Sequence, residues 1–305
     1  MKWRKYGLLY CHKNKECEEA YTTAPFVKFL YNDVFRIFFS PRDERRRSYP
    51  FFIDIDIFTG NVLNTASKPL VEPGACGAFD DAGCILFQIV EKSSKQFLYY
   101  AGWSLSLRVP FKCFIGAAIA EHGTHDFLKC TAAPILGANK FDPYLTGSPW
   151  VIVENEIWKM WYLTGIKWEE NADASPKHFY TITYAESSNG IDWIPSGKIC
   201  IPFKSDKEYA IARPVVIKKG AIYTMWYSYR ATDSCDTYQI GYAESMDGIE
   251  WLRKDDEAGI TASKSGWDSE MICYPFVFDH KGKTYMVYNG NGYGRTGIGL
   301  AELMP

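Results

Sequence analysis

The sequence has no long hydrophobic run and no excess of basic charge. Nowhere do about eighteen apolar residues follow one another, as a membrane-spanning helix requires. The first apolar stretch, residues 6–10, is too short for the core of a signal peptide. Lysine and arginine total 34 against 36 aspartate and glutamate residues, so the basic surface typical of nucleic-acid binding is missing. We therefore expect a cytoplasmic protein with no membrane span and no nucleic-acid partner.

Paired, patterned cysteines are also missing. The nine cysteines are odd in number and scattered, and several lie in apolar segments, as Cys84 does. A disulfide framework needs an even, patterned set in an oxidising compartment. Cys11, His12 and Cys17 could begin a metal site, but no second pair of ligands follows them. We expect reduced thiols and no bound metal.

Aromatic residues are abundant instead. They make up 16% of the chain, with 21 Tyr, 19 Phe and 10 Trp. The hydrophobic share of 47% and the charged share of 23% are ordinary for a soluble globular protein. Because aromatic side chains favour pleated, half-buried surfaces, the surplus indicates β-structure.

Three segments of the chain repeat one pattern. They open with Ser148-Pro149, Arg213-Pro214 and Tyr274-Pro275, and each has a methionine eleven residues after the proline. A short polar turn separates the apolar run after the proline from the run around the methionine. This predicts two antiparallel strands joined by a hairpin.

A third strand and a turn recur after each hairpin. Ala-Glu-Ser or Ala-Glu ends the strand, and Asn-Gly or Asp-Gly turns followed by an aromatic come after two of them. Residues that recur in every unit cannot all face one substrate, so we interpret these repeated motifs as structural. They contain Glu121, Glu186, Glu244, Glu302, Trp193 and Trp251.

Two weaker copies precede these three, which makes five units of about sixty residues. We predict an all-β fold: a single five-bladed β-propeller with four-stranded antiparallel blades. An open solenoid would need capping repeats, and none is visible. The last unit lacks its outer strand, which the N-terminal strand 6–10 can supply. The expected domain is 1–305, with blades at about 21–70, 79–136, 142–202, 208–263 and 268–305.

Candidate functional residues follow from this geometry. In a propeller, the loop before each inner strand and the loop after each second strand open on one face around the axis. The catalytic candidates there are Asp81, Glu270 and Asp142. The substrate-binding candidates are Arg213, Asp80, Arg42, Asp43, Arg47, Trp103, Trp168, Glu169, Arg230, Tyr274, Asn289 and Asn291. Carboxylates, arginines and aromatic rings together are typical of sugar sites, and glycosidic bond hydrolysis needs two carboxylates.

Several candidates have a structural alternative. The pair at 80–81 could cap a turn, and Asp142 could order its own loop. The pair at 42–43 could be an internal salt bridge as readily as a substrate contact. Arg213 stands where sister units have Ser or Tyr, and a charge there is costly without an anionic partner. We therefore expect Arg213 to bind an anionic group.

The repeated words at 185–193 and 243–251, with Ser-Pro and Arg-Pro opening the units, resemble those of glycosidase-type five-bladed propellers. That group includes arabinanases and xylosidases, invertases and levansucrases, and β-mannoside phosphorylases. More narrowly, the chain resembles bacterial glycosidase-like proteins encoded among surface-polysaccharide genes. The resemblance covers essentially the whole chain and is specific for the fold, but not for the substrate.

The resemblance also implies catalytic positions. Such glycosidases take a base or nucleophile Asp from the first blade, a pKa-tuning Asp from the second and an acid Glu from the third. Here the second blade matches through the pair at 80–81. The first opens at 22–25 without an Asp, and the third opens with Ser148, with Asp142 and Glu169 as its nearest carboxylates. A phosphorylase or transferase needs fewer carboxylates, because arginines can hold phosphate.

Three functions remain open at this point. The first is a carbohydrate-active enzyme that cleaves or transfers a glycosidic or sugar-phosphate bond, in the setting of surface-glycan metabolism. The second is a non-catalytic propeller that binds a glycan or sugar nucleotide, and the third is a protein-interaction scaffold. No cofactor is expected, with a structural Ca²⁺ in the axial channel as an alternative, although no dedicated calcium loop is visible.

Overall fold

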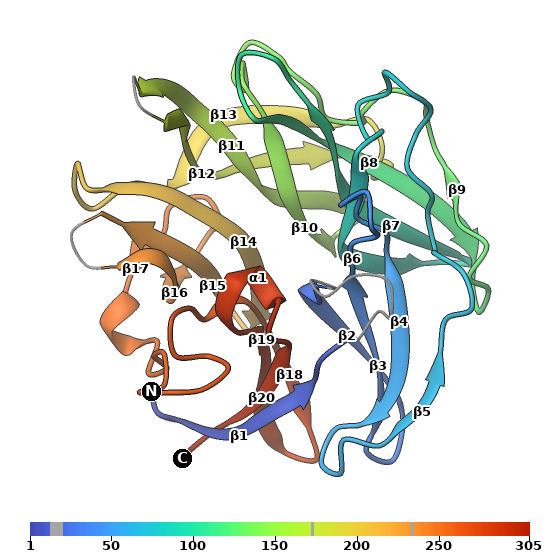
Figure 1. Ribbon diagram of the computed structural model, residues 1–305, viewed down its shortest axis with the longest axis vertical. Helices are drawn as coiled ribbons and strands as arrows, with labels where there is room; N and C mark the ends of the chain where they lie inside the picture. Colours follow the sequence, from blue (N-terminus) through green and yellow to red (C-terminus); the bar gives the residue numbers. More distant parts are fainter. Residues whose placement is uncertain (13–20, 172–173, 233–234) are drawn as a thin grey trace.

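The fold is a ring of β-sheets. A computed structural model describes residues 1–12, 21–171, 174–232 and 235–305, and its sheets stand around one central axis (Figure 1). These residues form strands β1 to β20, the short helix α1 (Asn291–Gly294) and the 3-10 helix η1 (Asp255–Glu257). The prediction of an all-β fold is confirmed. Within these ranges, no helix has the length and apolar character needed to cross a bilayer.

Two sheets contain four antiparallel strands that follow one another along the chain. The first contains, in order, β2 (Thr23–Tyr31), β3 (Val34–Ser40), β4 (Phe51–Asp56) and β5 (Val62–Thr65). The second contains β6 (Gly83–Lys92), β7 (Lys95–Leu105), β8 (Phe111–Glu121) and β9 (Leu128–Lys129). Each inner strand is paired with the next strand through a hairpin, as the repeats predict.

An eight-stranded sheet follows and has two similar halves. One half contains β10 (Thr146–Glu154), β11 (Ile157–Asn171), β12 (Ala174–Ser187) and β13 (Ile194–Ile201). The other contains β14 (Glu208–Lys219), β15 (Ile222–Ala231), β16 (Cys235–Ser245) and β17 (Leu252–Arg253). A single parallel pair, Tyr180 with Ala210, links β12 to β14 and so joins the halves.

The N-terminal strand completes the last sheet. The order there is β1 (Trp3–Tyr10), β20 (Ile298–Leu303), β19 (Lys283–Asn289) and β18 (Cys273–His280). Trp3 fixes the start of β1, because its Nε1 donates a hydrogen bond of 3.0 Å to the carbonyl oxygen of Ala258. Its ring also meets Trp226 edge-on, with centroids 5.4 Å apart. The predicted closing strand is confirmed, and it begins at Trp3.

Four inner strands carry an irregularity at the same place. Ala24, Ser148, Arg213 and Tyr274 have φ angles between 45° and 58°, and each precedes a proline. The register of the strand pair shifts at these positions. A non-glycine residue in this region is strained, and a bulge of this kind redirects its side chain. In four of the five inner strands, the bulge thus turns one variable side chain out of the regular pleat.

The repeated turns hold neighbouring sheets together. The carbonyl oxygen of Gly190 accepts a hydrogen bond of 2.8 Å from the hydroxyl of Tyr99, and that of Gly248 accepts one of 2.6 Å from Nε1 of Trp161. The rings of Tyr99 and Trp193 also meet edge-on across this junction. These contacts agree with the structural role that we assigned to the repeated words.

Candidate functional site

The candidate residues come from one edge of the sheets, here called the axial edge. It consists of the starts of inner strands β2, β6, β10, β14 and β18 and the ends of second strands β3, β7, β11, β15 and β19. Antiparallel pairing places these ends side by side, since Gly83 pairs with Trp103, Ala210 with Arg230 and Cys273 with Asn289. Helix α1 follows β19 at this edge and lies near the centre of the ring in Figure 1.

Arg213 is a fully buried cation at the axial edge of β14. Its Nη1 donates a hydrogen bond of 2.8 Å to the carbonyl oxygen of Phe87, and its Nη2 donates one of 2.9 Å to that of Pro25. Burial lowers the pKa of Arg213 to about 9, against an opposing effect of Tyr274, so the group is charged at neutral pH. We expected an anionic partner, but within the described residues Arg213 has carbonyl partners and no ion pair. Oxygen atoms of two other sheets accept hydrogen bonds from Nη1 and Nη2, and the buried Nε has no hydrogen-bond partner in the described chain.

Arg230, near the end of β15, lies among tyrosine rings. Its guanidinium carbon is 4.8 Å from the ring centroids of both Tyr209 and Tyr238. Nη1 donates a hydrogen bond of 2.9 Å to the hydroxyl of Tyr293, and Nη2 lies 2.8 Å from Nε2 of His178. Each cation–π contact contributes about 0.5–2 kcal/mol. No carboxylate of the described residues pairs with Arg230, and its Nε has no hydrogen-bond partner there.

His178 on β12 is the neutral partner of Arg230. Its ring is stacked on Tyr180, with an interplanar angle of 2° and centroids 4.8 Å apart. Burial lowers the pKa of His178 to about 4, and the charges of Arg230 and Lys177 add to the effect. An arginine can only donate, so Nε2 of the neutral imidazole is the acceptor. His178 therefore orients Arg230 without neutralising it.

Tyr274 places a hydroxyl group beside this cluster. It opens β18 with a φ of 53°, and its backbone N–H donates a hydrogen bond of 2.8 Å to Oγ of Ser228. Its half-buried ring lies 5.8 Å from that of Tyr238. Burial raises the pKa of Tyr274, while the charge of Arg230 opposes the rise. In the part of the chain that the structure describes, the hydroxyl of Tyr274 has no hydrogen-bond partner, so it is free to bind a ligand.

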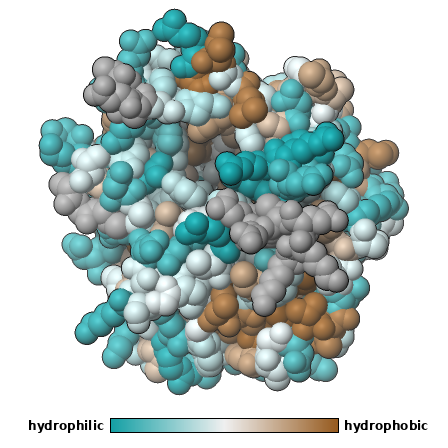
Figure 2. Space-filling view, in the orientation of Figure 1, coloured by the Kyte–Doolittle hydropathy of each residue, from teal (hydrophilic) through white to brown (hydrophobic). Residues whose placement is uncertain are grey.

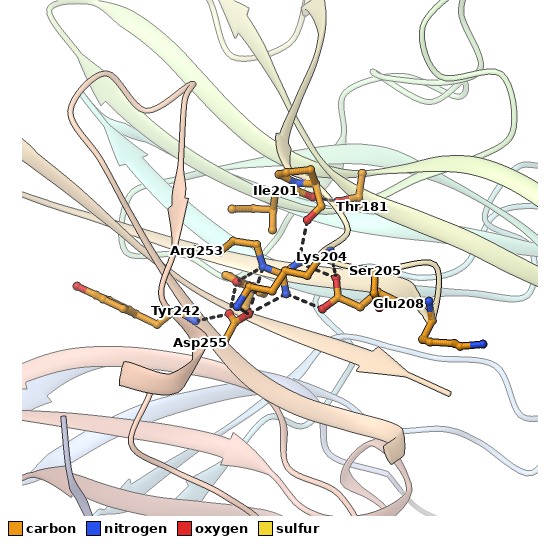
Figure 3. A network of polar contacts seen from close by, with 11 residues as sticks. Thr181, Ile201, Lys204, Ser205, Glu208, Tyr242, Arg253 and Asp255 are labelled. Carbon is orange, nitrogen blue, oxygen red and sulfur yellow. Dashed lines mark hydrogen bonds and ion pairs between the residues drawn. The ribbon is translucent and has the colours of Figure 1, made fainter. Parts of the chain in front are cut away.

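Other arginine charges inside the protein are matched by carboxylates. Figure 3 shows the network around Arg253 on β17. Arg253 forms ion pairs of 2.6 Å with Glu208 and 2.8 Å with Asp255, and Lys204 lies 2.8 Å from Asp255. Burial alone would raise the pKa of Asp255, but Arg253 and Lys204 outweigh it, and the pKa is lowered. Against this pattern, Arg213 and Arg230 are buried arginines that the described carboxylates leave unmatched.

The candidate Asp80 is a structural brace. Its carboxylate accepts a hydrogen bond of 3.0 Å from the hydroxyl of Tyr100 and lies 2.5 Å from Nζ of Lys129 on the outer strand β9. Asp268 repeats the arrangement with Tyr288 and a lysine of the outer strand β1. In both cases the acid lies 20 residues before the tyrosine. The recurrence assigns Asp80 to the frame, and its carboxylate is already occupied.

Asp142 is held in the same way. The hydroxyl of Tyr162, again 20 residues later, donates a hydrogen bond of 2.9 Å to its carboxylate. Nδ2 of Asn139 donates another of 2.7 Å. Asp142 is buried by these contacts. The structural alternative, that Asp142 orders its own loop, describes this environment.

Asp81 and Glu270 keep available carboxylates. Asp81 accepts one hydrogen bond of 2.9 Å from the backbone N–H of Gly77, which is a turn contact. Glu270 is exposed, and only its backbone is held, by the side chains of Asn291 and Thr237. Neither carboxylate has an ion pair with any cation in the described ranges. They are the two catalytic candidates whose charge remains unmatched.

Arg42, Asp43 and Arg47 form a site at the end of β3. Asp43 pairs with Arg47 at 3.0 Å, not with its neighbour Arg42, and also accepts a hydrogen bond of 2.8 Å from Tyr49. Burial would raise the pKa of Asp43, but the hydrogen bonds from Arg47 and Tyr49 outweigh it and lower the pKa. The guanidinium of Arg42 lies over Tyr21, 4.6 Å from its ring centroid. Arg42, Asp43 and Tyr49 line a cavity of about 240 Å³.

The two candidate asparagines are occupied by backbone groups. Asn289 accepts a hydrogen bond of 2.9 Å from the N–H of Ala24 and donates one of 2.8 Å to the carbonyl oxygen of Thr22. Asn291 accepts hydrogen bonds from the N–H groups of Glu270 and Met271. Both amides therefore fasten the last sheet to its loops and to the first sheet.

The remaining candidates divide between the cluster and the solvent. Trp168 meets His178 edge-on, with centroids 5.6 Å apart, so it belongs to the surroundings of Arg230. Trp103 lies under the guanidinium of Arg42, and its buried Nε1 has no hydrogen-bond partner in the described chain. Glu169 is exposed and pairs with Lys167 at 3.2 Å.

The outer rim carries a larger cavity of about 650 Å³, which contains none of the candidates. Its lining comes from β13 and the segment that leads into β17: Lys198, Ile199, Cys200, Pro202, Ile249, Glu250, Trp251 and Leu252. On the side seen in Figure 2, hydrophilic side chains cover much of the surface, and hydrophobic side chains gather in a few patches, the widest at the lower right. No group of three His, Cys, Asp or Glu residues in the described ranges is placed to hold a metal ion, and Cys17 lies outside these ranges.

Arg230, Tyr274 and Trp168 could be predicted from the sequence, but four residues around them could not. His178, Tyr209, Tyr238 and Tyr293 come from β12, β14, β16 and α1. For the three tyrosines, the only signal in the sequence is the surplus of tyrosine, which is spread over the whole chain, and His178 has no such signal. We define the arginine cluster as Arg230 with these four residues, Tyr180, Tyr274 and Trp168.

Comparisons with known sequences give two relatives over the full chain. No protein family model matches. The uncharacterized protein Rv1502 of Mycobacterium tuberculosis (strain ATCC 25618 / H37Rv) is 36% identical over 305 residues, which cover 99% of each chain. The uncharacterized protein MT1551 of strain CDC 1551 / Oshkosh gives the same values.

Comparisons with solved structures give glycosidase propellers. A structure described as a glycoside hydrolase has a TM-score of 0.74 at 16% identity and covers 99% of this chain and 91% of its own. The endo-arabinase of Bacteroides thetaiotaomicron VPI-5482 has a TM-score of 0.65 at 10% identity, with 94% and 96% covered. A structure from the GH130 family of mannoside phosphorylases has a TM-score of 0.64 at 15% identity, with 94% and 85% covered. The chain thus has the fold of the glycosidase-like propellers.

Proposed function

Because this chain belongs to the same family as the uncharacterized protein Rv1502 of Mycobacterium tuberculosis, and has a glycosidase-like propeller fold, we propose that it is a carbohydrate-active enzyme. It cleaves or transfers a glycosidic or sugar-phosphate bond at the axial edge, in surface-glycan metabolism. We count the halves of the eight-stranded sheet as two blades, which gives five blades in one domain over 1–305. Its cytoplasmic location and its independence of a cofactor are parts of the same proposal.

One observation supports this function above the others. The axial edge combines aromatic rings with two carboxylates, Asp81 and Glu270, that no described cation neutralises. Aromatic faces stack on sugar rings, and general acid–base work on a glycosidic bond needs two carboxyl groups in different protonation states. Asp80 and Asp142 are left out of the proposed machinery because their carboxylates serve as braces.

A non-catalytic sugar-binding propeller is the second candidate. The observation that favours it lies at the start of the first sheet, where the related glycosidases have an Asp. Thr22 and Thr23 stand there, and their hydroxyls donate hydrogen bonds to the carbonyl oxygens of Gly294 and Tyr293. A binding protein would keep the aromatic and arginine contacts without needing a carboxylate at this point.

A turnover screen separates the two candidates. Wild type, Asp81→Asn and Glu270→Gln are assayed on aryl-glycosides and on oligosaccharides with and without inorganic phosphate, with the rim variant Glu250→Gln as the matched control. We expect turnover in wild type and the control, and a loss of about 10²-fold or more in the other two, as removal of a general acid or base produces. Turnover that survives both changes would refute the residue assignment. Saturable sugar binding without any turnover would establish the second candidate.

A further inference from the structure

Arg230 is a buried cation whose countercharge is missing from the described chain. It is 8% exposed, and its hydrogen-bond partners are a tyrosine hydroxyl and a histidine ring. His178 accepts its hydrogen bond as a neutral ring. Burying a charge without a partner is costly, and proteins usually pair it or use it.

The surroundings add further positive charge. Nζ of Lys177 lies 3.7 Å from the ring centroid of Tyr209, which also contacts Arg230, and Lys177 has no ion pair among the described residues. Tyr209 donates a hydrogen bond to the exposed Asp236, so that carboxylate is directed to the tyrosine and has no ion pair with Arg230. The arginine cluster and the adjacent Lys177 therefore place two cations on aromatic rings, and no described anion pairs with either cation.

The arginine cluster also offers neutral donors. No described residue forms a hydrogen bond with the hydroxyl of Tyr274, and the Tyr274 ring lies beside that of Tyr238, which contacts Arg230. The Arg230 guanidinium has five N–H groups: two serve the contacts to Tyr293 and His178, Tyr180 is a third polar neighbour, and the buried Nε has no hydrogen-bond partner in the described chain. A planar guanidinium with free N–H groups, next to a hydroxyl donor, matches the oxygen atoms of a carboxylate or phosphate.

We infer that the sugar ligand carries an oxyanion, as a uronic acid or a sugar phosphate does, and that Arg230 binds it with the help of Tyr274 and Lys177. This inference rests on the proposed carbohydrate function and names the substrate class of the same site. A carboxylate and a phosphate ester share the chemistry that Arg230 recognises, so the test must separate them.

The test is calorimetric titration of the full chain with four probes: glucuronate, galacturonate, glucose 1-phosphate and the neutral methyl glucoside. We expect at least one charged sugar to bind about tenfold or more tightly than the neutral one. Whether a uronate or the sugar phosphate binds more tightly shows which anionic group the site recognises. Arg230→Gln should abolish this preference, and Tyr274→Phe should weaken it. Arg108→Gln, at an exposed arginine, is the matched control and should leave it unchanged.

Three outcomes would overturn the inference. Equal affinity of wild type for charged and neutral sugars would do so while leaving the proposed function intact, as would failure of wild type to bind any charged probe. A preference that persists in Arg230→Gln would place the anion elsewhere. If Arg230→Gln does not fold, Arg230→Lys, which keeps the charge and loses the planar fork, must reduce the preference for the charged sugar. Charged-sugar binding without turnover in the glycoside screen would refute the enzyme and keep the anion site.

Discussion

Nη1 of Arg213 and the carbonyl oxygen of Phe87 join two inner strands, β14 and β6, through a hydrogen bond of 2.8 Å. Nη2 reaches Pro25 on β2 in the same way. One side chain thus ties three inner strands together near the axis. Its charge is buried without a carboxylate partner, and the two carbonyl contacts offset part of the desolvation cost.

At position 213, the conservative replacement by lysine should destabilise the protein more than the replacement by methionine. Arg213→Lys keeps the charge but is too short to reach both carbonyls, so we expect a loss of about 2–4 kcal/mol of unfolding free energy. Arg213→Met should cost less, because it also removes the buried charge. Urea denaturation of both variants beside wild type measures the order. A lysine variant as stable as wild type would contradict this account of the site.

The adjacent residues Asp80 and Asp81 should respond differently to the same change. Asp80→Asn leaves Lys129 without its ion pair and disturbs the Tyr100 contact, so we expect a loss of about 2–3 kcal/mol. Asp81→Asn changes a turn contact and should stay within about 0.5 kcal/mol of wild type. Denaturant midpoints measured under one condition test this. Equal losses in the two variants would refute the brace.

The closing strand should depend on its tryptophan. Trp3→Ala removes a buried ring and its hydrogen bond to Ala258, for an expected loss of about 3–5 kcal/mol. Leu8→Ala on the same strand is the control, since Leu8 is 48% exposed, and should cost well under half as much. Thermal unfolding of the two variants tests the comparison. Similar melting temperatures would mean that β1 is not anchored through Trp3.

His178 should make the protein sensitive to mild acid. Its folded pKa of about 4 lies below the unfolded value. As the pH falls below about 6.5, the unfolded chain therefore takes up a proton that the folded chain refuses. The free energy of unfolding that the neutral His178 ring contributes at pH 7 is therefore lost between about pH 6.5 and pH 4, by up to about 3 kcal/mol.

The variant His178→Gln should flatten part of this slope in urea titrations at pH 7, 6 and 5. His12 and His125 also have lowered pKa values, mainly because of burial, so some slope remains. His122→Gln, at an exposed histidine, is the control and should follow wild type. Identical slopes in all three proteins would rule out His178 as the source.

Much of the fold could be predicted because it repeats along the chain. The interval from Pro149 to Met160 recurs twice, and in the structure Val151 pairs with Met160 as the hairpin requires. The closing strand could be predicted because the last unit stops after its third strand. Hairpins and turns are local, so their signals lie within a few residues of one another.

The site was predicted only in part, because its contacts are not local. His178 and Arg230 lie 52 residues apart and meet through side chains of β12 and β15. The 20-residue interval from Asp80 to Tyr100 was visible in the sequence and recurs at Asp142 and Asp268. The interval runs from a loop aspartate to a strand tyrosine, so it is not part of the repeated motifs. This interval assigns Asp80 and Asp142 to the frame of the propeller.

The pairing of β1 with β20 also determines how the ring would yield to mechanical force. The two strands are antiparallel, and Trp3 lies opposite Leu303, so both strands leave the sheet at the same end. Tension applied there would load the hydrogen bonds one after another, as in a zipper, and not all together in shear. The ring would therefore open at this seam by peeling, and the contact between Trp3 and Ala258 would be among the first to carry the load.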